Sequence, residues 1–135
     1  MSTFVLVPGG WHGAWCYREV TTLLRGRGHA VFALTLTGLG DRAHLAHPGV
    51  GLQTHIEDVV SAIEAEELSD VILLGHSYAG FVIAGTAERL PDRIRSLVFL
   101  DATVPRDGEL RISEERDRPF RHRDRRIRER DRAFR

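Results

Sequence analysis

Two hydrophobic patterns alternate along the chain. Short apolar runs that end at Gly or Pro are typical of buried strands, and longer segments whose apolar residues recur every three or four positions are typical of helices. We expect strands at residues 4–7, 30–36, 71–74 and 96–100. We expect helices at residues 15–27, 54–63 and 78–90.

The order of these elements predicts the fold class. Strands alternate with helices from residue 4 to residue 100, which is typical of a parallel sheet with helices on both faces. The run at residues 71–74, Val-Ile-Leu-Leu, lacks the polar alternation of a half-exposed strand. Strands of a parallel sheet that is covered on both sides have this composition. The sequence therefore predicts an α/β fold.

The second expected helix follows a loop at residues 41–51, which is rich in His, Gly and Pro. The spacing of Thr54 and Glu57 matches a capping box, which predicts that the helix begins at Thr54. Its apolar face consists of Ile56, Val59, Val60 and Ile63. We assign three histidines to the loop before this helix and expect them to be exposed: His44, His47 and His55.

Charge and apolar content both change near residue 110. Residues 1–110 carry 8 Arg and 13 acidic residues, a net charge of −5, whereas residues 111–135 carry 11 Arg and 6 acidic residues, a net charge of +5. The second segment has few apolar residues, too few to offset the entropy lost on ordering the chain. We therefore predict a partial α/β domain at residues 1–110, incomplete at its C-terminal end, and an Arg-rich tail at residues 111–135.

Three interpretations of this tail stay open. The first is a segment read out of frame, because all 19 basic residues of the chain are Arg, which points to a GC-rich coding sequence. The second is a basic segment that contacts nucleic acid or another anionic surface, although its charges are of mixed sign and only Phe120, His122 and Phe134 intersperse them. The third is a disordered, solvated tail without a role.

The remaining composition bears on the cellular location of the protein and on whether it needs a cofactor. The chain has one cysteine, Cys16, which excludes an internal disulfide and fits a reducing compartment. Its first residues lack a basic segment followed by a long apolar run, so we expect no signal peptide, no membrane span and a cytoplasmic location. The spacing of the His and acidic residues does not suggest a metal site, and we expect no cofactor.

One segment indicates chemistry directly. The hexapeptide at residues 75–80, Gly-His-Ser-Tyr-Ala-Gly, lies between the apolar run 71–74 and the helix expected at 78–90. Small residues two positions before and after Ser77 allow a sharp strand-to-helix turn that presents the serine hydroxyl. The alternative role of Ser77 is a helix N-cap, for which serine is also favoured.

Four motifs in this order resemble the α/β-hydrolase superfamily, and within it small bacterial esterases related to plant methylesterases and hydroxynitrile lyases. The resemblance covers about residues 3–110. The motifs are VPGGWHGAW at 7–15, LTGLGDR at 36–42, GHSYAG at 75–80 and LDATVP at 100–105. Two positions depart from the family pattern: Pro8 stands where the family usually has His, and Ala79 stands where it usually has a second glycine.

The resemblance implies a serine hydrolase of carboxylic esters. Ser77 would be the nucleophile, and the backbone N–H groups of Gly10 and Tyr78 would form the oxyanion hole. Trp11 and His12 are candidates for the lining of the substrate pocket. A plain turn at residues 9–10 is the alternative interpretation of that loop.

The rest of the catalytic triad is not recognisable. Asp101 and His122 formally follow Ser77 in the family's chain order, but neither fits its expected place. Asp101 ends an expected strand beside the Ser77 turn, where some hydrolases place their acid, but related sequences have an aspartate there besides a later catalytic acid. His122 lies in the Arg-rich tail, without a strand or helix to position it. His76 flanks the nucleophile, and its side chain should point away from it. We therefore expect a catalytically incomplete fragment that is inactive by itself.

Three functions remain open at this point. The first is an ester hydrolase whose present chain is a fragment, and its partner in an intact version would be a small-molecule ester. The second is a lyase of the same fold. The third is a non-enzymatic module with an Arg-rich interaction tail.

Overall fold

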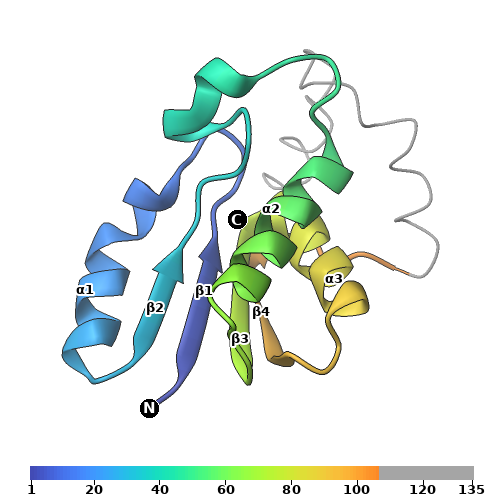
Figure 1. Cartoon of the computed structure of the whole chain (residues 1–135). Helices are drawn as coiled ribbons and strands as arrows, with labels where there is room; N and C mark the ends of the chain where they lie inside the picture. The colour runs from blue at the N-terminus through green and yellow to red at the C-terminus, as the bar shows by residue number, and fades with distance from the viewer. Residues whose placement is uncertain (107–135) are drawn as a thin grey trace.

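The computed structural model describes residues 1–106 as a four-stranded sheet with helices on both sides (Figure 1). The strands are β1 (Thr3–Val7), β2 (Ala30–Ala33), β3 (Val71–Ser77) and β4 (Ile94–Ala102). Their order in the sheet is β2-β1-β3-β4, and every neighbouring pair is parallel. The predicted α/β fold is thereby confirmed. The tail predicted at residues 111–135 lies outside the described residues.

The three expected helices are present. They are α1 (Arg18–Gly26), α2 (Leu52–Ala65) and α3 (Ala79–Arg89). A 3-10 turn, η1 (Ala14–Tyr17), leads directly into α1, and a second one, η2 (Gly40–Leu45), occupies part of the segment expected to be loop.

Two boundaries differ from the prediction for local reasons. Helix α2 begins at Leu52 rather than at Thr54, because the Thr54 hydroxyl accepts a hydrogen bond from the backbone N–H of Gly51 at 3.2 Å and so closes the first turn. Strand β4 is longer than expected and has irregular register beside Arg95 and Asp101. Such bulges add a residue to one strand without interrupting the sheet, so the apolar pattern does not reveal them.

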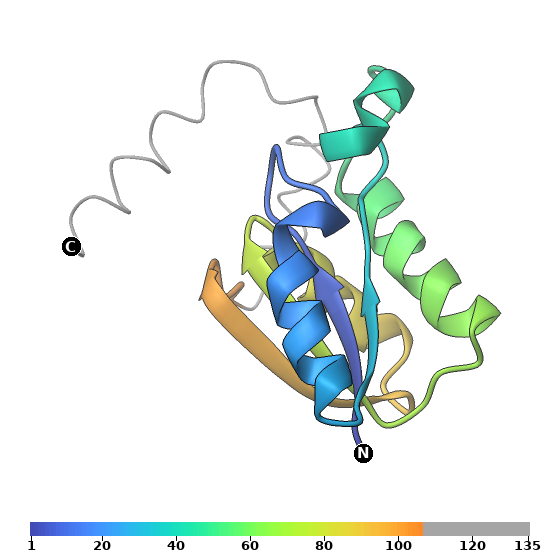
Figure 2. The ribbon, with the colours of Figure 1, turned by 90° about the vertical axis from the view of Figure 1, so that its left-hand side faces the viewer.

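The core lies in two layers. Helices α2 and α3 cover one face of the sheet, where buried residues of all three elements form the larger cluster, and α1 covers the other face over β1 and β2 (Figures 1 and 2). Leu6, Tyr17 and Val31 are the buried members of the smaller cluster. This two-sided cover explains why the strands are continuous apolar runs.

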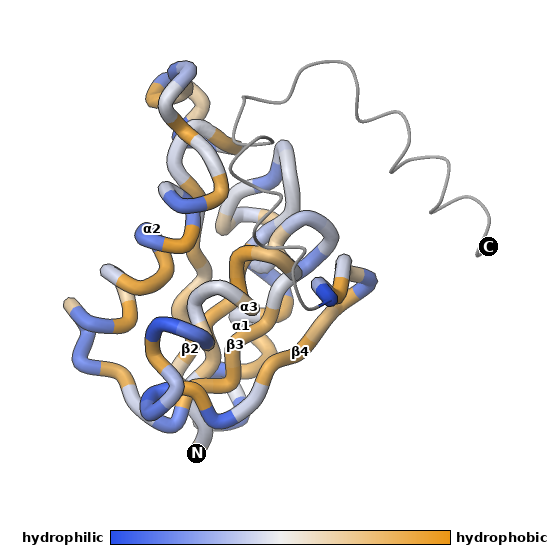
Figure 3. The backbone as a smooth tube through the Cα atoms, turned by 90° about the vertical axis from the view of Figure 1, so that its right-hand side faces the viewer, coloured by the Kyte–Doolittle hydropathy of each residue, from blue (hydrophilic) through white to orange (hydrophobic). Residues whose placement is uncertain are grey.

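The outer strand β4 is covered on one face only. Leu97 and Phe99 pack on the α2–α3 side, whereas Val98 and Leu100 are 37% and 49% exposed on the α1 side. Figure 3 shows this strand as an apolar segment at the margin of the sheet. Among residues 1–106, no further strand pairs with the outer edge of β4. An apolar strand with unpaired backbone groups favours association with another chain.

Candidate active site

Ser77 lies at a strained turn between β3 and α3. Strand β3 ends at Ser77 and α3 begins at Ala79, so one residue separates the two elements. The φ angle of Ser77 is 54°, in the left-handed region that serine rarely adopts. Such strain persists only where the surrounding structure enforces it, and it concentrates at functional sites.

Close backbone contacts enforce this turn. A Cβ atom at Gly75 would lie 2.8 Å from the carbonyl oxygen of Ala79, and one at Gly80 would lie 1.9 Å from the carbonyl oxygen of Thr103. Ala79, by contrast, is fully buried with its methyl group accommodated. The departure of Ala79 from the family pattern is therefore compatible with the turn, and Gly80 is required by its contact with the segment after β4.

The loop after β1 lies against the nucleophile. A Cβ atom at Gly9 would be 3.1 Å from the Cβ of Ser77 and 3.1 Å from the carbonyl oxygen of His76, so only glycine lets the loop approach this closely. Gly10 follows, and its carbonyl oxygen accepts a hydrogen bond of 2.9 Å from Nδ1 of His12. The loop that carries the expected oxyanion donor is therefore adjacent to Ser77, and the His12 side chain stabilises it.

A second loop fixes the end of this segment. The hydroxyl of Thr35 accepts a hydrogen bond from the backbone N–H of Ala14 and donates one to Oδ1 of Asp41, each at 2.8 Å. A Cβ atom at Gly40 would lie 2.8 Å from the Cα of Gly13, so the two loops touch backbone to backbone. The motifs at residues 7–15 and 36–42, far apart in sequence, thus form one structural unit.

Tyr17 joins η1 to the end of β1. Its buried hydroxyl donates a hydrogen bond of 2.8 Å to the carbonyl oxygen of Val7. Burial raises the pKa of the Tyr17 phenol well above its usual value, since the charged form would lose its hydration there. This hydrogen bond joins the two ends of the Val7–Tyr17 segment.

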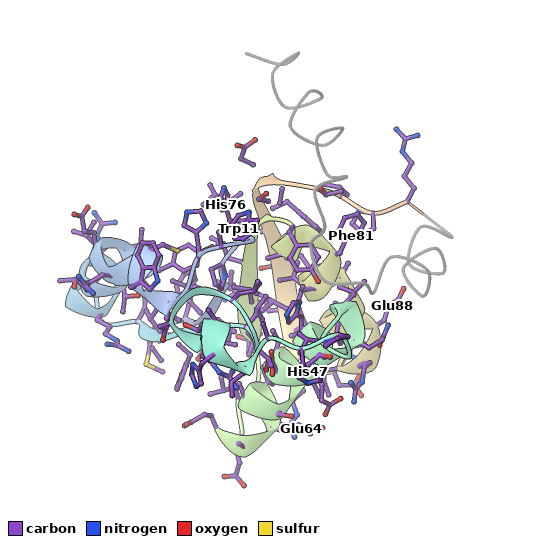
Figure 4. The ribbon with its side chains drawn as sticks, turned by 90° about the horizontal axis from the view of Figure 1, so that it is seen from above. Trp11, His47, Glu64, His76, Phe81 and Glu88 are labelled. Atoms are coloured by element: carbon purple, nitrogen blue, oxygen red, sulfur yellow. The ribbon has the colours of Figure 1, made fainter. Side chains whose placement is uncertain are left out.

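The candidate pocket residues lie at the loop end of the strands. Trp11 is 66% exposed and has a φ of 71°, whereas His12 is half-buried. The His12 ring lies 5.8 Å from that of Trp15 and 6.1 Å from that of His76. Figure 4 shows His76 and Trp11 close together at this end. Their assignment to a substrate pocket stays a prediction.

Residues 1–106 do not supply Ser77 with a base. Within residues 1–106, no histidine or carboxylate is hydrogen-bonded to the Ser77 hydroxyl. Asp101 is exposed at the end of β4, with a φ of 44°. His122, the other residue that fits the family's chain order, lies outside the described residues. Nor does the described part contain a group of three or more His, Cys, Asp or Glu residues that could hold a metal ion.

One expected surface residue is instead part of this region. His55 is only 4% exposed and lies within α2, so its assignment to an exposed loop was wrong. Its Nδ1 lies 2.9 Å from the hydroxyl of Tyr78, and its Nε2 lies 2.8 Å from the carbonyl oxygen of Thr37. The helical period could have revealed this burial, because His55 lies four residues before Val59 on the apolar face of α2. His44 and His47 are exposed, as expected.

The comparisons with known proteins agree with this geometry. A sequence profile described as "Alpha/beta hydrolase family" matches residues 4–135. The chain belongs to this family. Within residues 1–106, the chain has no helix that is long and apolar enough to cross a membrane.

Several relatives of this chain are named esterases. A carbendazim hydrolyzing esterase from Nocardioides sp. (strain SG-4G) is 59% identical over 109 residues, which are 81% of this chain and 45% of the relative. Methylesterase 10 from Arabidopsis thaliana is 35% identical over 103 residues, which are 76% of this chain and 38% of the relative. The predicted relationship to bacterial esterases and plant methylesterases is confirmed.

Solved structures show the same likeness. An extracellular α/β-hydrolase from a Paenibacillus species, described as homologous to tobacco salicylic acid binding protein 2, matches with a TM-score of 0.74 and 38% identity over 80% of this chain and 43% of that chain. Polyneuridine aldehyde esterase matches with a TM-score of 0.71 and 30% identity over 86% and 46% of the two chains. The chain thus spans less than half of the length of these relatives.

Proposed function

We propose that this chain carries the nucleophile and the oxyanion donors of a serine esterase that acts on small-molecule carboxylic esters. The observation that carries the proposal is the strained φ of Ser77 together with the close approach of Gly9 to its side chain. This arrangement places the half-buried Ser77 beside the loop of Gly10 and the first turn of α3. The esterase names of the relatives support the choice of ester substrates.

The reaction of an intact version would be acyl transfer. The Ser77 hydroxyl would attack the ester carbonyl carbon while a base takes its proton, and the N–H groups of Gly10 and Tyr78 would stabilise the oxyanion. The positive end of the α3 dipole lies at Tyr78 and favours that negative charge. The alcohol would then leave, and water would release the acid from Ser77. This chemistry needs no metal and no organic cofactor.

The described part of the chain lacks the base of this machinery. Because the described residues place no histidine on Ser77, we propose that the chain alone has no Ser77-dependent turnover of p-nitrophenyl acetate. Loss of triad members in a serine hydrolase leaves a rate of about 10³–10⁴ over water from binding and the oxyanion hole.

An external base provides the decisive experiment. Imidazole at high concentration should take the Ser77 proton, so that the acetyl group is transferred from p-nitrophenyl acetate to the Ser77 oxygen and p-nitrophenolate leaves. Mass spectrometry of the proteolysed protein should find the acetyl group on Ser77. The exposed Ser61 offers the matched control: Ser61→Ala should acetylate normally, and Ser77→Ala should not.

Acetylation that is absent from Ser77, or equal at Ser61, would refute the proposed nucleophile. Large Ser77-dependent turnover without imidazole would support the esterase and refute the missing base. A lyase of this fold is the second candidate, because the turn at Ser77 does not by itself distinguish a lyase from an esterase. The products that a full-length relative forms would distinguish a lyase from an esterase.

A further inference from the structure

His55 occupies a buried position between two segments of the candidate active site. It comes from α2, yet it contacts Thr37 in the loop after β2 and Tyr78 directly after the nucleophile. A buried imidazole is costly unless both ring nitrogens are hydrogen-bonded, and here both are. The pair links residues that are 18 and 23 positions away from His55 in sequence.

The partners determine the direction of these bonds. A carbonyl oxygen can only accept, so Nε2 of His55 must carry the proton that it donates to Thr37. In the neutral ring, Nδ1 is then an acceptor, and the Tyr78 hydroxyl donates to it. The two rings also pack edge to face, with centroids 5.6 Å apart and planes at 79°.

The carbonyl group that orients His55 is itself held. Asp58, one turn further along α2, accepts hydrogen bonds from the backbone N–H and from the hydroxyl of Thr37, both at 2.7 Å. All three polar groups of Thr37 are therefore bonded to α2. The resulting chain of contacts runs from Asp58 through Thr37 and His55 to Tyr78.

We propose that His55 is a positioning residue for the reaction at Ser77. It holds the Tyr78 side chain, and through it the Ser77–Tyr78 peptide, whose N–H is the expected oxyanion donor. The inference rests on the proposed function for its catalytic meaning. The strained turn at Ser77 needs such a constraint, because a strained turn relaxes when its constraints are removed. A shift of about 1 Å in a catalytic group can cost on the order of 100-fold in rate.

The test uses the whole 135-residue chain with two substitutions that separate packing from hydrogen bonding. His55→Phe keeps a ring but removes both hydrogen bonds. His55→Gln keeps one donor and one acceptor in a single amide, so it should restore the contacts with Thr37 and Tyr78. The exposed His47 offers the control His47→Phe.

Nuclear magnetic resonance gives the first readout. In the wild type, ¹⁵N shifts of the His55 ring should show the proton on Nε2, and Tyr78→Phe should change the Nδ1 shift. His55→Phe should introduce microsecond-to-millisecond exchange broadening at the Ser77 and Tyr78 amides, whereas the Val5 amide in β1 should be unchanged. His55→Gln and His47→Phe should resemble the wild type.

The imidazole-driven acetylation of Ser77 gives the second readout. His55→Phe should slow its maximal rate by about 10- to 100-fold without changing the ester concentration at half-maximal rate, and His55→Gln should recover most of the loss. The proposal would be overturned if His55→Phe left the Ser77 and Tyr78 amide signals unchanged or broadened the Val5 signal equally. It would also be overturned if His55→Gln failed to restore the wild-type signals. If wild-type Ser77 is not acetylated, the proposed function fails, and the resonance data still decide whether His55 positions Tyr78.

Discussion

Gly80→Ala should destabilise the protein even though alanine is the better helix former. Gly80 is the second residue of α3 and is buried. An added Cβ would lie 1.9 Å from the carbonyl oxygen and 2.8 Å from the carbonyl carbon of Thr103. These are backbone atoms, so the contact cannot be relieved by a side-chain rotation.

The size of the effect follows from three contributions. Overpacking a close contact costs about 1–3 kcal/mol. Displacing Thr103 also breaks the hydrogen bond of 3.1 Å from its backbone N–H to the carbonyl oxygen of Ser77, which costs roughly 1 kcal/mol. Replacing glycine in a helix gains about 1 kcal/mol. The net loss is about 1–3 kcal/mol, a substantial part of the 5–15 kcal/mol that is typical of small domains.

The assay is thermal or urea unfolding of the 135-residue chain, followed by circular dichroism. A loss of this size should lower the melting temperature by roughly 5–20 °C. Gly26→Ala is the matched control, because a Cβ at the end of α1 would meet no atom within 4 Å and should stabilise by up to about 1 kcal/mol. Equal stability of Gly80→Ala and the wild type would refute the packing argument, and a loss in Gly26→Ala would refute the use of these contacts as a guide.

Two further expectations concern stability and association. Because burial raises the pKa of Tyr17 in the folded state, the free energy of unfolding should keep the full Tyr17 contribution below a pH of about 10, the ordinary tyrosine pKa, and should fall as the pH rises above it. Urea midpoints should show this fall in the wild type and a shallower fall in Tyr17→Phe. At neutral pH, Tyr17→Phe should also lose roughly 1 kcal/mol of stability, because it lacks the hydrogen bond to Val7. Val98→Lys should reduce concentration-dependent self-association in light scattering, because it places a charge on the exposed apolar strand β4, and the same substitution at exposed Glu88 should not; undiminished association would exclude β4 as the contact.

The regular elements were predictable because their signals are local. The helix expected at residues 78–90 is α3 (Ala79–Arg89), and the apolar run 71–74 lies within β3 (Val71–Ser77). The observed boundaries differ from the expected ones where a residue distant in sequence changes the local conformational preference. The strand expected through residue 36 ends at Ala33, since Thr35 turns to bind Ala14 and Asp41.

The candidate site was only partly visible in the sequence. The small residues around Ser77 predicted a sharp turn, and the structure contains one with a φ of 54°. The family motif also placed a glycine loop after the first strand, but the contact between Gly9 and Ser77 required the parallel pairing of β1 with β3. The burial of His55 contradicts its expected place in an exposed loop, because His55 belongs to α2 and lies on the apolar face of that helix.

The sequence by itself determined the α/β class, the strand–turn–helix at Ser77 and the resemblance to esterases, because these depend on hydrophobic period and short motifs. Only the tertiary structure decided which distant groups meet. It brought Thr103 against Gly80, Gly9 against Ser77, and His55 between Thr37 and Tyr78. The physical reason is that a local period specifies which face of an element is buried, whereas sheet order and helix packing decide what that face touches.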